Sequence, residues 1–187
     1  MFIETEDTPN PATLKFLPGR TVMPGRTTAD FVSPDGVAGR SALADVLFDQ
    51  PGVARVFLGG DFVAVTKDES VEWSALKPQI LSVLVDFFVS GRPVIDEDTA
   101  IEEDLIAPED EEIVRQIKEL LDTRVRPAVA GDGGDIVFRG YRDGVVRLTM
   151  QGACSGCPSS RATLKHGVEN MLRHYVPEVV SVEQVDA

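Results

Sequence analysis

The apolar positions in the first half of the chain follow the period of a strand in some segments and that of a helix in others. Alternation over residues 13–17 predicts a strand, whereas the apolar spacing over 41–48 predicts a short helix. The residues between them, 19–40, are rich in Gly, Pro, Thr and Asp and predict a long loop. Two further apolar runs, 53–58 and 62–66, lie on either side of Gly-Gly-Asp, which predicts a β-hairpin.

A longer helix is predicted after this hairpin, because large apolar residues recur there at helical spacing. They are Trp73, Leu76, Ile80, Leu84 and Phe87. Ser70 is placed to cap the start of the helix, and Gly91 is placed to end it. Pro78 predicts a kink or a later start, because proline cannot donate the backbone hydrogen bond of a helix interior.

The pattern changes abruptly at residues 93–112, which carry ten acidic residues and no basic one. Like charges at this density repel one another and favour an extended link over a packed element. We therefore predict a domain over residues 1–92, an acidic linker over 93–107 and a second domain over 108–187.

The second domain is predicted to begin with a helix that Pro108 opens, because proline is favourable in the first turn and the acids around it complement the helix dipole. The apolar stripe of this helix consists of Ile113, Ile117, Leu120 and Leu121. Asp132-Gly133-Gly134-Asp135 predicts a turn, for which the conformational freedom of glycine is a sufficient reason.

Alternating segments over 136–141 and 145–151 predict two strands joined by Asp143-Gly144, a strong hairpin signal. Pro158 suits the first position of a following helix, and residues 179–185 predict a last strand. The buried face of that helix is predicted to consist of Leu164, Val168, Met171, Leu172 and Tyr175. The fold class is therefore α+β: two small domains, each a small, mostly antiparallel sheet packed against helices, joined by the acidic linker.

The distribution of charged and apolar residues excludes two classes of partner. The formal net charge is −13, and no basic stripe is present that could release counterions from a nucleic acid. No segment reaches the ~18 apolar residues of a membrane-spanning helix, because Ser82 and Asp86 interrupt the longest apolar run. The first residues are acidic and do not resemble a secretory or transit signal, so we predict a cytoplasmic protein.

The chain has only two cysteines, and both lie in one C-x-x-C motif, Cys154-Ser155-Gly156-Cys157. Cys154 is predicted just past a strand and Cys157 at the start of a helix, where backbone amides favour the thiolate form. Residues 144–168 contain no acidic residue, and such surroundings suit an anionic iron–sulfur cluster. We expect the two sulfurs to lie close together, with at least one partly exposed.

A C-x-x-C motif alone is compatible with a zinc site, a thiol–disulfide redox site or an iron–sulfur cluster. A redox protein of the thioredoxin type is disfavoured, because no Trp precedes the motif and Ser-Gly replaces Gly-Pro within it. A cluster requires four thiolates and the chain has two. A two-fold homodimer is the simplest source of the other two, because it places identical pairs face to face.

His166 and His174 are the only histidines in the sequence. They lie eight residues apart on one predicted helix, so both are not expected to join the cysteines at one metal. We interpret them as solvent-exposed helix residues and do not assign them to a site.

Two blocks of the sequence resemble the Nfu family. The C-terminal block is similar to the NifU-like domain. It consists of Val125-Arg126-Pro127, Asp132–Asp135 and Gln151-Gly152-Ala153-Cys154-Ser155-Gly156-Cys157-Pro158-Ser159-Ser160. The N-terminal block, from Thr5 to Phe16, is similar to the Nfu N-terminal domain. Within it, Thr8-Pro9-Asn10-Pro11 predicts a turn leading into a strand.

This resemblance implies an iron–sulfur cluster scaffold or carrier rather than an enzyme. It implies a [4Fe–4S] cluster held between two subunits, with Cys154 and Cys157 as the ligands from each chain. The implied partners are apo iron–sulfur client proteins, upstream cluster-assembly proteins and a second copy of the chain when cluster is bound. A thiol–disulfide redox protein that uses the same cysteines is the alternative function.

Overall fold

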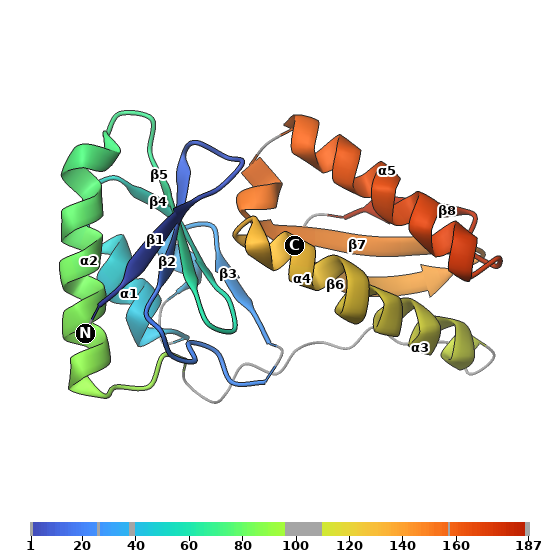
Figure 1. Ribbon diagram of the computed structural model, residues 1–187, viewed down its shortest axis with the longest axis horizontal. Coiled ribbons are helices and arrows are strands. Elements are labelled where there is room, and N and C mark those ends of the chain that lie inside the picture. The colour runs from blue at the N-terminus through green and yellow to red at the C-terminus, as the bar shows by residue number, and fades with distance from the viewer. Residues whose placement is uncertain (1, 26, 38–39, 96–109, 157, 186–187) are drawn as a thin grey trace. The chain divides into compact units, whose positions relative to one another are not determined.

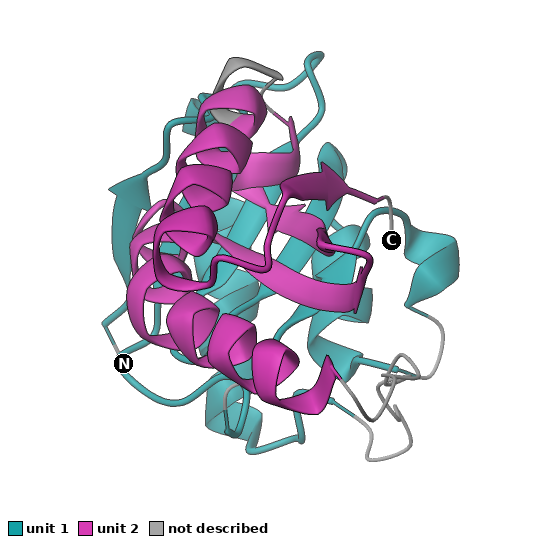
Figure 2. Cartoon of the chain, turned by 90° about the vertical axis from the view of Figure 1, so that its right-hand side faces the viewer, with its two compact units in different colours: residues 1–100 teal, residues 101–187 magenta. Residues whose placement is uncertain are grey.

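The computed structural model of the chain describes residues 2–25, 27–37, 40–95, 110–156 and 158–185. The chain divides into two compact units, residues 1–100 and 101–187 (Figure 2). Each unit contains a small sheet and its own helices, so the predicted α+β class is confirmed (Figure 1). The predicted acidic linker lies mostly in residues 96–109, which are outside the described part of the chain. None of the described helices is long and apolar enough to span a membrane.

Unit 1 is built on a five-stranded antiparallel sheet with the order β1-β2-β5-β4-β3. Its strands are β1 Glu4–Asp7, β2 Thr13–Leu17, β3 Ala29–Phe31, β4 Val53–Leu58 and β5 Val63–Lys67. Its helices are α1 Ala42–Phe48, α2 Trp73–Ser90 and a short 3₁₀ turn, η1 Pro34–Gly36. The predicted strand over 13–17, the hairpin of β4 and β5, and both helices are confirmed.

The two edge strands of this sheet, β1 and β3, were not predicted from the sequence. β1 is a short, polar strand with the sequence Glu-Thr-Glu-Asp, and β3 has only three residues within the segment predicted as a loop. An edge strand pairs on one side only and needs no apolar alternation to do so. Their neighbours in the sheet, rather than their own patterns, therefore determine these strands.

The turn between β1 and β2 confirms the interpretation of Thr8-Pro9-Asn10-Pro11. The hydroxyl of Thr8 donates to the carbonyl oxygens of Asn10 at 2.9 Å and Thr13 at 3.0 Å. The amide oxygen of Asn10 accepts the backbone N–H of Ala12 at 3.0 Å. These local hydrogen bonds fix the turn that leads into β2.

The helix ends of unit 1 agree with the sequence only in part. Ser41 caps α1, because its hydroxyl oxygen accepts the backbone N–H of Ala44 at 3.1 Å. Gly91 ends α2 in the left-handed conformation, with φ 71°. Helix α2 starts at Trp73 and contains Pro78 in its interior, so the predicted later start at Pro78 is wrong. The prediction of Ser70 as the cap is wrong, because its backbone N–H bonds to the Asp68 carboxylate in a local turn and Glu72 occupies the cap position.

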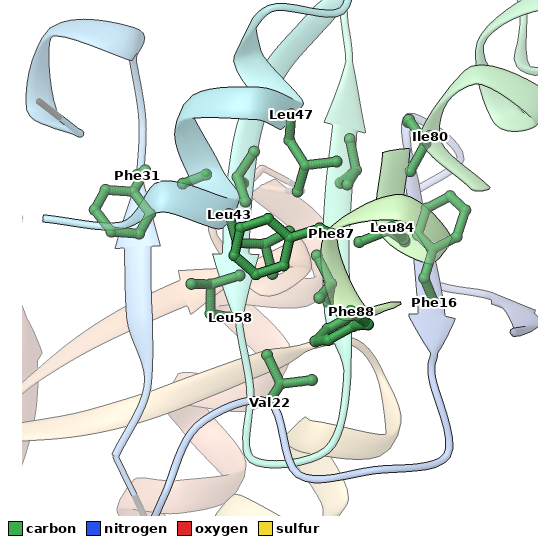
Figure 3. Close-up of a cluster of buried hydrophobic side chains, with 14 of the residues drawn as sticks. Phe16, Val22, Phe31, Leu43, Leu47, Leu58, Ile80, Leu84, Phe87 and Phe88 are labelled. Carbon is green, nitrogen blue, oxygen red and sulfur yellow. The ribbon is translucent and has the colours of Figure 1, made fainter. Parts of the chain in front are cut away.

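The core of unit 1 lies between the sheet and the two helices (Figure 3). Phe16 of β2, Leu43 and Leu47 of α1, and Leu84 and Phe87 of α2 are each at most 1% exposed. Each buried side chain of this size contributes about 1.5–3 kcal/mol to folding. The apolar stripes that predicted the two helices are therefore the faces that bind them to the sheet.

Unit 2 has a three-stranded sheet with the order β6-β7-β8. Its strands are β6 Gly134–Arg142, β7 Val145–Gly152 and β8 Ser181–Gln184. Its helical segments are α3 Glu111–Leu120, a π-helical turn Leu121–Val125, α4 Arg126–Gly131, a 3₁₀ turn η4 Ala153–Gly156, and α5 Pro158–Tyr175. Strands β6 and β7 are antiparallel, whereas β8 runs parallel to β7 after the α5 crossover (Figure 1).

The hairpin between β6 and β7 is confirmed, with Asp143 and Gly144 at φ 50° and 80° as its turn residues. The first helix is described from Glu111, while Pro108 lies outside the described residues. The turn at Asp132–Asp135 is shorter than predicted, because β6 already begins at Gly134.

Tyr175 was predicted on the buried face of α5 but is 47% exposed. It is the last residue of the helix, and the guanidinium carbon of Arg124 lies 4.8 Å from the centre of its ring. The ring therefore gains a cationic neighbour instead of a place in the core. The other predicted positions of this face, including Val168 and Leu172, do contact the core of unit 2.

Replacement of Leu84 by Ala should destabilise unit 1 by about 2–5 kcal/mol, because a fully buried side chain is removed from a packed core. Denaturant unfolding followed by the fluorescence of Trp73 measures this directly, since Trp73 is the only tryptophan of the chain and lies in unit 1. Val89→Ala on the same helix is the matched control, because Val89 is 73% exposed. Equal unfolding midpoints for the two variants would contradict the described core.

Candidate metal centre

Cys154 lies in the 3₁₀ turn η4, directly after the end of β7 and before α5. This confirms its predicted position just past a strand. The residue is only 8% exposed and belongs to the core cluster of unit 2, which also contains Leu148 and Met150. Cys154 is therefore not the partly exposed cysteine of the pair. Cys157 lies outside the described residues, so the expectations that one sulfur is partly exposed and that the two sulfurs lie close together stay predictions.

Backbone hydrogen bonds attach the Cys154 turn to the beginning of β6. Strand register pairs Gly134 with Gly152, and the N–H of Ala153 donates to the carbonyl oxygen of Gly133 at 3.1 Å. On the other side of Cys154, the hydroxyl of Ser155 donates to the carbonyl oxygen of Gly152 at 2.8 Å. The position of Cys154 is thus fixed by a segment about twenty residues earlier in the chain.

Gly134 provides the space for the Cys154 sulfur. A Cβ atom at Gly134 would lie 2.9 Å from the sulfur of Cys154 and 2.6 Å from the carbonyl oxygen of Gln151. Both distances are shorter than ordinary contacts, so no larger residue fits without a shift. The sequence suggested glycine here for turn geometry, and that reason applies to Gly133, whose φ is 81°. At Gly134 the reason is the close approach of the Gln151 carbonyl oxygen and of the Cys154 thiol.

The environment of Cys154 raises the pKa of its thiol to about 11, first through burial and then through the carboxylates of Asp132 and Asp135. The prediction of surroundings that favour a thiolate is therefore wrong for this cysteine. The acid-free segment 144–168 describes only the residues that are near in sequence. Pairing of β6 with β7 brings the two aspartates near Cys154 from outside that segment.

Arg126 and Asp135 form a bidentate ion pair beside this turn. Nε and Nη2 of Arg126 donate to the two carboxylate oxygens of Asp135 at 2.8 and 2.7 Å. Asp135 holds the pKa of Arg126 above its ordinary value. One charge-assisted contact therefore joins two blocks that are separate in the sequence, Val125-Arg126-Pro127 and Asp132–Asp135.

The π-helical turn presents Arg126 to this contact. The backbone N–H of Arg126 bonds to the carbonyl oxygen of Leu121, five residues earlier. Pro127 cannot donate a backbone hydrogen bond, and its ring clashes with the carbonyl four residues back in a regular helix. The wider turn relieves this clash, so the helix continues into α4 with Arg126 as its first residue.

Neither histidine joins Cys154. His166 and His174 are exposed on α5, and the ring of His174 packs against that of Tyr175 with their centres 4.9 Å apart. Among the described residues, no group of three or more His, Cys, Asp or Glu side chains is arranged to hold a metal ion. Within the described part of the chain, Cys154 supplies the thiol at this site, and no set of three potential ligands is completed around it.

Gly134→Ala should destabilise unit 2 by about 1–3 kcal/mol, because the new methyl group meets the Cys154 sulfur and a backbone carbonyl. Gly167→Ala, inside α5 with no atom within 4 Å of the added Cβ, should instead stabilise it by up to about 1 kcal/mol. Thermal unfolding followed by circular dichroism distinguishes these signs. Wild-type stability of Gly134→Ala would show that the contact at Cys154 is not tight.

The thiol of Cys154 should react slowly with iodoacetamide at neutral pH in the apo protein. Because its pKa is raised to about 11, the thiolate fraction and the rate should grow about tenfold per pH unit from pH 8 to about 10 and should level off above pH 11. The Cys157→Ser variant isolates this cysteine. Urea-unfolded protein is the control and should titrate near the ordinary value of 9.0. The same midpoint in folded and unfolded protein would contradict the described environment.

The raised pKa also has a consequence for stability. The folded state holds the Cys154 proton more tightly than the unfolded state, so its contribution is present below pH 9 and is lost as the pH rises towards 11. In the same Cys157→Ser variant, the unfolding midpoint of unit 2 should therefore fall over this range.

Two curated relatives match almost the whole chain. It is 55% identical over 185 residues to the NFU1 iron-sulfur cluster scaffold homolog, mitochondrial, of Drosophila ananassae, and 56% identical over 186 residues to the protein of that name from Drosophila virilis. Each match covers 99% of this chain and 64% or 62% of the relative. The chain thus spans somewhat less than two thirds of the length of these relatives.

The prediction of a cytoplasmic protein is wrong, because both relatives are named as mitochondrial proteins. The acidic first residues do not decide the compartment. A targeting segment acts separately from the folded domains and is removed after use, so the composition of a domain carries no record of it.

A solved structure of a NifU-like protein from Saccharomyces cerevisiae is 31% identical, covers 52% of this chain and 87% of its own, and has a TM-score of 0.48. Two family models also match the chain. The model described as scaffold protein Nfu/NifU N terminal matches residues 3–91, and the NifU-like domain matches residues 117–183. The chain therefore belongs to the Nfu family, with an Nfu/NifU N-terminal domain in its first half and a NifU-like domain in its second.

Proposed function

We propose that this chain is an iron–sulfur cluster scaffold that binds a [4Fe–4S] cluster between two subunits and delivers it to apo-proteins. Cys154 and Cys157 are the proposed ligands from each chain. The observation that carries the proposal is the placement of Cys154 at the strand–helix junction of a NifU-like domain, with its sulfur against the backbone of Gly134. The names of the two relatives, both iron-sulfur cluster scaffold homologs, agree with it.

The number of ligands supports a shared cluster. A [4Fe–4S] cluster takes four thiolates, and the chain has two cysteines. The described residues offer no group of three potential ligands that would complete a site within one chain. A second copy supplies an identical pair through a two-fold axis. A cluster held in this way is cargo, because separation of the subunits releases half of its ligands at once.

The state of Cys154 favours a cluster ligand over the alternative of a thiol–disulfide redox protein. A redox cysteine of that type attacks as a thiolate and has a lowered pKa. Burial and two carboxylates instead raise the pKa of Cys154 to about 11. A buried neutral thiol is also slow to oxidise, so Cys154 is protected from oxidation in the apo protein. Binding of iron then displaces the proton.

The two units have different proposed roles. Unit 2 holds the cluster, and unit 1 recruits client proteins or upstream cluster-assembly proteins. The sequence of unit 1 contains no cysteine or histidine, so it offers no comparable metal chemistry. We propose that the acidic segment between them is an extended tether, which raises the local concentration of cluster at a bound client.

Anaerobic reconstitution with iron and sulfide should yield about two iron atoms per chain, because a [4Fe–4S] cluster is divided between two subunits. The loaded protein should be brown and should elute earlier than the apo protein on a sizing column. Four irons per chain in a monomer would contradict the shared cluster. A colourless protein that cycles with a thiol reductant would support the redox alternative instead.

The variants Cys154→Ser and Cys157→Ser should each abolish cluster retention in the same assay. Cys154→Ser should in addition destabilise the apo protein by about 1–3 kcal/mol, because it introduces a hydroxyl among buried apolar side chains. Circular dichroism of the apo variants controls for folding. Retention of a full cluster by either folded variant would remove that cysteine from the ligand set.

A further inference from the structure

Arg126 is the centre of a small network at the start of the NifU-like domain. Besides its two hydrogen bonds to Asp135, its Nη1 donates to Oδ1 of Asp122 at 3.0 Å. The side chain of Asp135 is 4% exposed, so its carboxylate depends on this partner in place of water. Arg126 itself is 24% exposed and reaches Asp135 from the first residue of α4.

The network is connected to Cys154 through the backbone of β6. Oδ1 of Asp135 also accepts the backbone N–H of Ile136 at 2.8 Å, which fixes the carboxylate relative to the strand. Gly134 precedes Asp135 directly and forms the wall behind the Cys154 sulfur. Gly133, one residue further back, accepts the N–H of Ala153. A displacement of Asp135 would therefore reach both the wall behind the Cys154 sulfur and the hydrogen bond to Ala153 within two residues.

We propose that Arg126 is a positioning residue for the cluster ligand Cys154. By holding Asp135 with a rigid two-point contact, Arg126 fixes Gly133 and Gly134 against the Cys154 turn and keeps the sulfur at one position. Arg126 also neutralises a carboxylate that lies near the proposed site of an anionic cluster. This inference rests on the proposed function, since it assigns a residue to the cluster site of that function.

The alternative explanation is that the ion pair only stabilises the fold. The chain contains a matched comparison for this purpose: Arg55 of β4 donates from Nε to Oδ1 of Asp30 at 2.8 Å, and its Nη2 contacts the other carboxylate oxygen. This pair is also bidentate and also has a buried aspartate, 5% exposed. It lies in unit 1, which has its own core, so its loss should affect folding and leave the metal centre unchanged.

The first test measures local opening in the full-length apo protein by amide hydrogen exchange. In Arg126→Gln and Arg126→Lys, the Ala153 amide should exchange about tenfold faster or more, because its acceptor Gly133 is no longer held. The Val185 amide, bonded to the carbonyl of Leu148 at 2.9 Å in the same unit, is the control and should keep its wild-type rate. Equal acceleration of both amides would show a merely structural role and overturn the proposal.

Lysine retains the charge of Arg126 but cannot form the two-point contact, so Arg126→Lys separates geometry from charge. We expect it to behave like Arg126→Gln in exchange at Ala153. Restoration of the wild-type rate by lysine would mean that charge alone suffices, and would overturn positioning by the rigid contact. Because lysine keeps an ion pair with Asp135, Arg126→Lys should fold even if Arg126→Gln does not, and the proposal can still be tested.

The second test measures cluster retention in the full chain. After reconstitution, both Arg126 variants should lose the brown absorbance to an iron chelator about tenfold faster than the wild-type protein or more, whereas Arg55→Gln should lose it at the wild-type rate. Rates within twofold of the wild-type value for both Arg126 variants would overturn the role of Arg126. Failure of the wild-type protein itself to bind a cluster would refute the proposed function, and the exchange result at Ala153 would still stand separately.

Discussion

The antiparallel pairing of β6 with β7 is the constraint on which the candidate metal centre depends. It aligns Gly134 with Gly152 and so places the turn that precedes β6 against the turn that carries Cys154. Neither turn has the length or apolar content to hold its shape alone. Together they form a small backbone scaffold, joined by the hydrogen bond from Ala153 to Gly133, in which the sulfur has one well-defined place.

The same pairing creates an electrostatic conflict that the fold resolves locally. It brings carboxylates towards a buried thiol, and both burial and negative charge oppose thiolate formation. Arg126 compensates one of these carboxylates, Asp135, through a charge-assisted fork. Cys154 is therefore a neutral thiol beside a paired charge.

Unit 1 and unit 2 meet the requirement for a core in different ways. The five-stranded sheet of unit 1 buries large aromatic and aliphatic side chains under two helices, and Phe16 and Phe87 are among them. The core of unit 2 is built on three strands, and Cys154 is one of its members. In unit 2 the candidate functional group is therefore part of the packing, which couples the chemistry of the site to the stability of the domain.

Local sequence patterns are sufficient to predict helices α1, α2, α3 and α5, the central strands, the β4–β5 and β6–β7 hairpins, the α+β class and the position of Cys154 after a strand. These features depend on local periodicity and turn residues such as Asp143 and Gly144, which act within a few positions. The edge strands β1 and β3, the burial and raised pKa of Cys154, and the contact of Arg126 with Asp135 follow instead from long-range contacts. Each of these depends on which distant segments pair, and a one-dimensional pattern does not contain that information.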